Sequence, residues 1–92
     1  MSLESLFPDL KENIKKKQTN KYALILHNDE VNDFEHVMES LIEVCRHNSE
    51  QAEQCTLLAH LKGKCDVKHG EYSYLEPMRE ALLLRGISAT IE

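Results

Sequence analysis

The short polar segment His27–Glu30 brings together side chains that can bind a charged group. An imidazole, an amide and two carboxylates follow one another there, directly after an apolar run. Asn and Asp often form turns in which the side chain bonds to the nearby backbone, so a simple turn is one interpretation. The other is that this loop forms part of a binding site.

Catalytic chemistry is poorly supported. Asp29 and Glu30 are neighbours, and neighbouring residues of an extended segment point to opposite sides, so they would not face one substrate bond as an acid and base pair. The chain has no G-x-S-x-G elbow and no phosphate-binding glycine loop, and it holds only three glycines. We therefore expect a binding module and not an enzyme.

A metal site is also poorly supported, although the chain has five histidines and three cysteines. No C-x-x-C or H-x-x-x-H spacing occurs. Cys55, His60 and Cys65 follow at intervals that, on a helix, turn the first two in different directions. Cysteines acting as small buried apolar residues explain the pattern better, so we expect no metal and no other cofactor.

Two elements are predicted to hold the loop. Tyr22–His27 is a short apolar run closed by turn-forming residues, which indicates a buried strand. Over residues 34–45 the apolar side chains recur every three or four positions, the period of an amphipathic helix. Asn32 or Asp33 can cap this helix, and Glu35 follows Asn32 at the spacing of a capping box.

A second helix and a second strand follow. Asn48 and Gln51 are spaced as a capping box, and Gly63 is a natural end for the helix they begin. Residues 64–68 alternate between polar and apolar, which indicates a half-buried strand, and residues 69–70 are expected to end it.

A third helix and a last strand complete the predicted order. Ser73 and Glu76 are spaced as a capping box, so Pro77 is expected in or near the first turn, where proline is tolerated. Gly86 ends this helix, and residues 87–91 alternate as a strand. The order β-α-α-β-α-β predicts a small α+β domain with helices packed on one face of a three-stranded sheet.

Length and composition narrow the class of protein. Ninety-two residues build one core, and the formal charge of −5 argues against nucleic acid as a partner. No apolar run approaches the length of a membrane span, and the start of the chain lacks the features of a signal peptide. Three cysteines cannot all pair, which favours a reducing compartment. We expect a cytoplasmic protein, with a flexible N-terminal extension over residues 1–20 and the folded domain over residues 21–92.

Several pieces of this sequence occur together in one known family. The pieces are YALILHNDE at 22–30, FEHV at 34–37, QAE at 51–53, and His60 followed by Gly63-Lys64. Their order and spacing resemble ClpS, the adaptor of bacterial Clp proteases that recognises N-terminal degradation signals. The resemblance covers about residues 21–92 and weakens beyond Lys64. The C-terminal domain of the ribosomal stalk protein has a related fold, so architecture alone does not settle function.

The resemblance implies a site for the α-amino group of a bound polypeptide, held by Asn28, Asp29 and His60. A free α-amino group has a pKa of about 8, so at neutral pH it is mostly protonated and offers only donors. An amide oxygen, a carboxylate and a neutral imidazole nitrogen supply the acceptors that it needs. Glu30 would form an acidic rim, and His27 would be scaffold at the end of the strand.

The first side chain of the polypeptide would then enter an apolar pocket between the first two helices. The residues expected to line it are Phe34, Val37, Thr56, Leu57 and Ile87. A stripe at helical spacing is more often core than pocket, so for Phe34 and Val37 both interpretations stay open.

Three places depart from the family pattern. Family members commonly carry an aromatic residue where Val31 stands, Thr-Pro or a similar pair where Asn32-Asp33 stands, and a methionine where Thr56 stands. The loop is therefore expected to be more acidic, and the pocket wall shorter and more polar. The surface that docks the protease in the family also differs here, so no docking residues are assigned.

Two hypotheses follow. The first is an adaptor that binds N-terminal peptides of substrate proteins and the N-terminal domain of a Clp-type AAA+ unfoldase. Its substrates would begin with a bulky apolar residue, as N-degrons do. The second is a module with the same fold that serves protein interaction or regulation and has lost N-degron delivery.

Overall fold

The structure is a computed structural model that describes residues 22–92, so the extension expected over residues 1–20 lies outside the described residues. The elements, in chain order, are β1 (Tyr22–His27), α3 (Phe34–Cys45), α4 (Ser49–Lys62), β2 (Lys64–Gly70), α5 (Tyr72–Leu84) and β3 (Ala89–Ile91). The predicted β-α-α-β-α-β order is confirmed.

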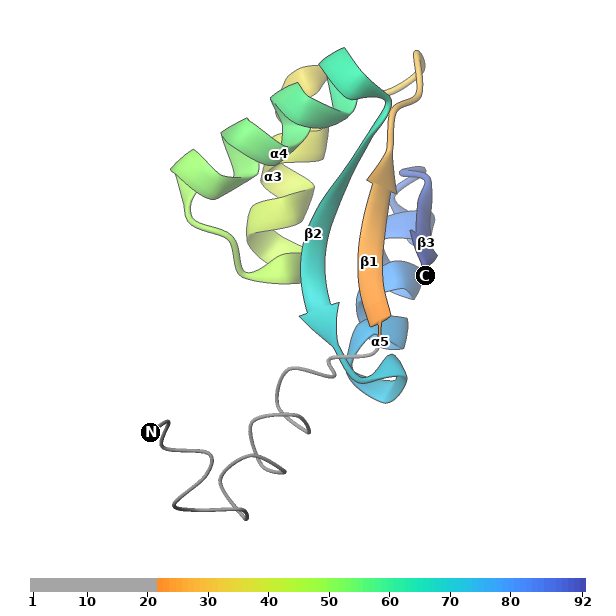
Figure 1. Ribbon diagram of the computed structural model, residues 1–92. Helices are drawn as coiled ribbons and strands as arrows, with labels where there is room; N and C mark the ends of the chain where they lie inside the picture. The colour runs from red at the N-terminus through yellow and green to blue at the C-terminus, as the bar shows by residue number, and fades with distance from the viewer. Residues whose placement is uncertain (1–21) are drawn as a thin grey trace, which may run out of the picture.

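The three strands form one antiparallel sheet in the order β2-β1-β3 (Figure 1). Leu24 and Leu26 alternate along the central strand β1, so they share one face of the sheet, and both are fully buried. They form a single apolar cluster with residues from the other two strands and the three helices of the described residues. The helices therefore cover this face, as predicted. None of the helices within residues 22–92 is long and apolar enough to span a bilayer.

The starts of α3 and α4 are capped by side chains. Asp33 caps α3 by accepting a hydrogen bond of 2.8 Å from the His36 backbone N–H, so the box predicted between Asn32 and Glu35 is wrong. The Asn32 side chain bonds instead to Asp29 and Gly86. At α4 the capping box of Asn48 and Gln51 is present in both directions, which confirms that prediction.

The start of α5 was predicted wrongly. The helix begins at Tyr72, one residue before Ser73, and its N-cap Glu71 makes no side-chain capping bond. The box between Ser73 and Glu76 is therefore not formed, and Pro77 lies in the second turn. Proline has no N–H, so the Ser73 carbonyl lacks its helical donor there.

Contacts with the sheet explain the early start of α5. The rings of Tyr22 and Tyr72 meet edge to face with centroids 5.5 Å apart. A Cβ added at Gly70 would lie 2.8 Å from the Tyr74 ring, so the helix packs closely on the end of β2. That strand also runs on through Gly70, beyond its predicted end, because Tyr22 pairs with Gly70.

Candidate functional site

The loop after β1 is fixed to the neighbouring elements by its backbone. The His27 N–H donates to the Ser88 carbonyl at 3.0 Å, just before β3, and the Asn28 N–H donates to the Gly63 carbonyl at 2.9 Å. Gly63 ends α4 in a left-handed conformation with φ of 93°. These bonds bring the loop next to the last turn of α4, which carries His60.

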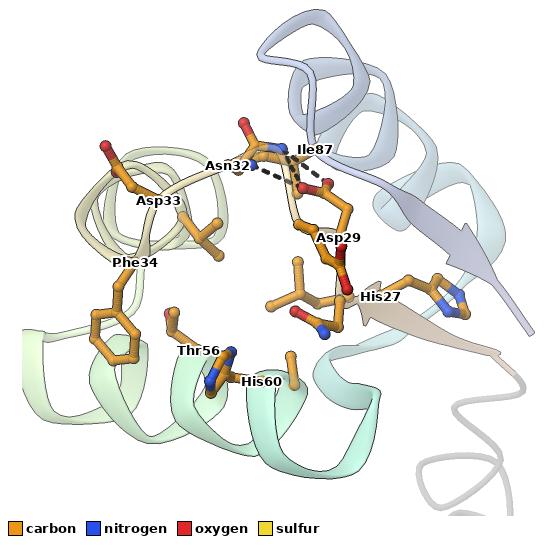
Figure 2. A pocket seen from close by; sticks show the side chains of 13 residues that line it. His27, Asp29, Asn32, Asp33, Phe34, Thr56, His60 and Ile87 are labelled. Atoms are coloured by element: carbon orange, nitrogen blue, oxygen red, sulfur yellow. Dashed lines mark hydrogen bonds between the residues drawn. The ribbon is translucent and has the colours of Figure 1, made fainter.

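A pocket of about 460 Å³ opens between this loop, α3 and α4 (Figure 2). The residues that line it are Leu26, His27, Asn28, Asp29, Glu30, Asn32, Asp33, Phe34, Val37, Thr56, Ala59, His60 and Ile87. Thr56, Ala59 and His60 are three and four residues apart on α4, so one face of that helix forms one wall. Phe34 and Val37 share a face of α3 for the same reason.

The structure brings together nearly all the residues singled out in the sequence. All four candidates for binding an amino group or forming its rim line the pocket, namely Asn28, Asp29, Glu30 and His60. Four of the five candidates for its apolar wall also line it, namely Phe34, Val37, Thr56 and Ile87.

Leu57 is the exception, because it does not line the pocket and is 45% exposed. Each residue of an α-helix is rotated by about 100° from the one before, so Leu57 faces away from the wall that its neighbour Thr56 forms. Ala59 takes part in the wall instead. Its spacing of three residues from Thr56 was the signal that could have identified it.

Four residues with no expected binding role also line the pocket, namely Leu26, His27, Asn32 and Asp33. The ring of His27 points away from the centre of the pocket in Figure 2. Its Nε2 lies 2.7 Å from Thr90 Oγ1 on β3. His27 thus joins the two strands, which agrees with a scaffold position at the end of β1.

The deep part of the pocket is apolar. Ile87 and Thr56 are buried, whereas Phe34 is 40% exposed at the mouth. The Thr56 hydroxyl donates to the Ala52 carbonyl within its own helix at 2.6 Å. Because that proton is already used, the threonine contributes less polarity to this wall than its residue type suggests.

The mouth of the pocket is acidic. Asp29, Glu30 and Asp33 contribute carboxylates, and no lysine or arginine occurs among the described residues that line it. Asp29 Oδ1 accepts hydrogen bonds from the backbone N–H groups of Asn32 at 2.9 Å and Val31 at 3.0 Å. These bonds, that of Asn32 foremost, hold the pKa of the Asp29 carboxyl below its ordinary value, so it keeps its charge.

Within residues 22–92, no group of three or more histidine, cysteine or acidic side chains could hold a metal ion. Cys55, His60 and Cys65 accordingly form no such group there. The arrangement is that of a pocket with an apolar interior and an anionic mouth, which suits a ligand with an apolar body and a positive charge.

The sequence of this chain is similar to those of known proteins. Residues 17–85 match the family model described as ATP-dependent Clp protease adaptor protein ClpS. Two curated relatives are the ATP-dependent Clp protease adapter proteins ClpS of a Synechococcus strain and of Prochlorococcus marinus, 34% and 36% identical over 83 residues. Each alignment covers 84% of this chain and 75% or 74% of the relative.

A solved structure is also similar, that of Agrobacterium tumefaciens ClpS2 bound to L-phenylalaninamide. It is 26% identical in sequence, with a TM-score of 0.72, and the match covers 77% of this chain and 93% of that one.

Proposed function

Because this chain belongs to the ClpS family of ATP-dependent Clp protease adaptors, we propose that its pocket binds N-degrons and that the chain delivers their proteins to a Clp-type AAA+ protease. As a member of that family it is an adaptor and not an enzyme. The observation that carries the proposal is the union, in one pocket, of an acidic mouth with a buried apolar interior.

The mouth supplies acceptors for an ammonium group. Oδ2 of Asp29 accepts from the Asn32 amide at 2.8 Å, and a carboxylate oxygen can accept more than one hydrogen bond, so it keeps capacity for a ligand. The Asn28 side chain and the His60 imidazole line the same mouth from the loop and from α4. An internal peptide nitrogen carries one hydrogen and no charge, so acceptors placed in this way would select true N-termini. Each charge-assisted bond contributes roughly 1.5–3 kcal/mol.

The interior suits a large apolar first side chain. Burying one such side chain contributes roughly 1.5–3 kcal/mol. Together with two or three polar contacts, less the ordering cost, this gives binding of about micromolar strength. L-phenylalaninamide, which the structural relative binds, has a free α-amino group beside a benzyl group, and this supports the same ligand class here.

The proposed partner for delivery is the N-terminal domain of a Clp-type AAA+ unfoldase. Membership of the adaptor family supports a Clp protease component as the partner. The cytoplasmic location expected from the sequence stays a prediction, and all three cysteines, which lie in the described part of the chain, are unpaired there.

A titration with paired peptides tests the proposal. We expect a peptide that begins with Phe to bind at least about tenfold more tightly than its N-acetylated form, because acetylation removes the charge and the donors that the mouth binds. Fluorescence anisotropy of a label at the C-terminal end of the peptide measures both affinities.

Two variants sharpen that titration. His60→Ala should weaken binding of the free peptide and leave binding of the acetylated peptide unchanged. His69→Ala is the matched control, because His69 is an exposed histidine on β2 that lies outside the pocket. Equal affinity for the two peptides would contradict N-degron binding and favour the alternative, an interaction module with a ClpS fold. For that alternative, Val31 and Leu61, 92% and 68% exposed, offer apolar surface.

A further inference from the structure

The side chain of Asn32 joins the acidic loop to the end of α5. Its Nδ2 lies 2.8 Å from Asp29 Oδ2, 3.0 Å from Asp29 Oδ1 and 2.7 Å from the Gly86 carbonyl oxygen. Figure 2 shows the Asp29 carboxylate turned toward Asn32. We call this side chain with its two partners, Asp29 and Gly86, the Asn32 bridge.

The chemistry fixes the orientation of this amide. All of the oxygens around Nδ2 are acceptors, two on a carboxylate and one on a carbonyl. An amide turned the other way would place its own oxygen against them and lose every bond. Asn32 therefore donates with both N–H groups, one shared between the carboxylate oxygens and one to Gly86. No serine or threonine has two donors with which to reach both partners.

The Gly86 end of the bridge lies directly before a wall of the pocket. Gly86 adopts a left-handed conformation with φ of 78°, and the next residue, Ile87, is buried in the pocket wall. A second side chain supports the same turn, because His36 Nε2 donates to the Arg85 carbonyl at 2.9 Å. Two side chains near the start of α3 thus fix the turn after α5, although the two regions are far apart in sequence.

We propose that Asn32 is a positioning residue, whose amide holds the Asp29 carboxylate at the mouth and the Ile87 wall in fixed relative places before a ligand arrives. The inference rests on the proposed function for its effect on binding, although the bridge itself does not. It gives a role to one of the positions where this chain departs from the family pattern.

Pre-organisation explains why such a bridge matters. A loop that is already ordered loses less conformational freedom when the ligand binds. Without the amide, Asp29 keeps its backbone donors and the His27 N–H still bonds to Ser88, but the direct link between the Asp29 carboxylate and Gly86 is lost. The carboxylate at the mouth can then shift more easily relative to the wall that Ile87 forms. The loss should appear as weaker binding, by about three- to tenfold, the equivalent of one net hydrogen bond.

The test compares wild type with Asn32→Ala by two measurements. Carbon-detected NMR of the Asp29 carboxyl follows its titration, and we expect the pKa of Asp29 to shift upward in the variant because a donor to the charged form is lost. The titration with the Phe-initiated peptide should show the three- to tenfold loss. Slow hydrogen exchange of the Asn32 side-chain amide in the wild-type protein tests the bridge without any variant, so the test stands even if the variant does not fold.

Asn48→Ala is the matched control. Asn48 also makes capping hydrogen bonds, but at the start of α4 and outside the pocket. Its loss should lower thermal stability while the Asp29 titration and the peptide affinity stay unchanged. An unshifted Asp29 pKa, or an unprotected Asn32 amide, would overturn the bridge.

Two further outcomes distinguish the bridge itself from its effect on peptide binding. A shifted Asp29 pKa with unchanged affinity would overturn the positioning role. A wild-type chain that bound neither peptide would overturn the proposed function, and the NMR measurements would still decide whether the bridge exists.

Discussion

The paired helices α3 and α4 differ sharply between their two ends. At the end joined by residues 46–48, Leu41, Cys45 and Ala52 are fully buried in the core. The Lys68 ammonium closes this end by donating to the Cys45 carbonyl at 2.8 Å. We call it the closed end. Leu41, Cys45 and Ala52 all belong to the common apolar cluster.

At the other end, which we call the open end, the same two helices enclose the pocket. Phe34 belongs to the apolar stripe of α3 but remains 40% exposed, and His60 on α4 is exposed opposite it. The loop with Asp29 and the buried Ile87 fill the space between the helices only in part. One helical stripe therefore serves as core at one end and as binding surface at the other.

The largest expected difference between the ends is in stability. Leu41→Ala removes a fully buried side chain and should lower the free energy of unfolding by about 2–5 kcal/mol. Phe34→Ala should lower it by only about 1–2 kcal/mol, because that side chain is 40% exposed. Urea denaturation measures both values.

Binding should show the opposite ranking. Phe34→Ala removes part of the pocket and should lower the affinity for the Phe-initiated peptide by about tenfold or more. Leu41→Ala, measured well below its unfolding midpoint, should bind as wild type does. A Phe34→Ala variant as unstable as Leu41→Ala would show that Phe34 is core and would remove the distinction between the ends.

The helix ends give a second comparison, with effects of about 1 kcal/mol. Both α3 and α4 end in a left-handed residue, Arg46 with φ of 61° at the closed end and Gly63 with φ of 93° at the open end. Glycine adopts this conformation without a Cβ penalty, whereas other residues are strained in it. Arg46→Gly should therefore stabilise the chain by roughly 0.5–1 kcal/mol.

Gly63→Ala should have the opposite sign, with a loss of about 1 kcal/mol. A Cβ at Gly63 meets nothing within 4 Å, so backbone conformation alone would cause the loss. Because the Gly63 carbonyl accepts from Asn28, this variant should also weaken peptide binding, whereas Arg46→Gly should not. Thermal unfolding and the peptide titration together measure these effects. Parallel changes in affinity for both variants would contradict the separation of the two ends.

The sequence predicted the closed end better than the open end. The Asn48 and Gln51 box at the start of α4 is a local signal that acts over a few residues, and its prediction is confirmed. The start of α5 was predicted wrongly because it depends on contacts of Tyr72 and Tyr74 with β1 and β2. A local sequence pattern cannot predict contacts between separate elements.

At the open end, the resemblance to a family indicated which residues meet, and the pocket contains all of them except Leu57. The turn interpretation of this loop is confirmed for Asp29, whose carboxylate accepts from the backbone N–H groups of Val31 and Asn32. The sequence could not indicate the link to Gly86, because Asn32 and Gly86 are separated by more than half of the described chain.

The prediction of Leu57 as a pocket residue is wrong, and Ala59 takes that place. Helical spacing from Thr56 and His60 favours Ala59, so this residue was within reach of the sequence.

The smallest expected effect is a loss of stability in acid, which arises at the open end alone. Hydrogen bonds hold the pKa of Asp29 below its ordinary value of 3.8 in the folded chain. The stability that this carboxylate contributes is therefore complete above 3.8 and is lost as the pH falls through the lowered pKa. Asp29→Asn, which cannot titrate, should lose less unfolding free energy than wild type between neutral pH and a pH below 3.8. Urea denaturation at each pH measures the difference.

Glu39→Gln is the control for this last comparison, because Glu39 is an exposed carboxylate on α3 that makes no hydrogen bond or ion pair within the described residues. It should follow the wild-type dependence on pH. Since the bonds of Asp29 define the shape of the mouth, binding of the Phe-initiated peptide should weaken over the same pH range in which that stability is lost. If Asp29→Asn lost as much stability in acid as the wild-type chain, the Asp29 carboxylate would contribute nothing to the fold of the loop. The loop would then owe its shape to its backbone bonds with Ser88 and Gly63 and to the neighbouring helices.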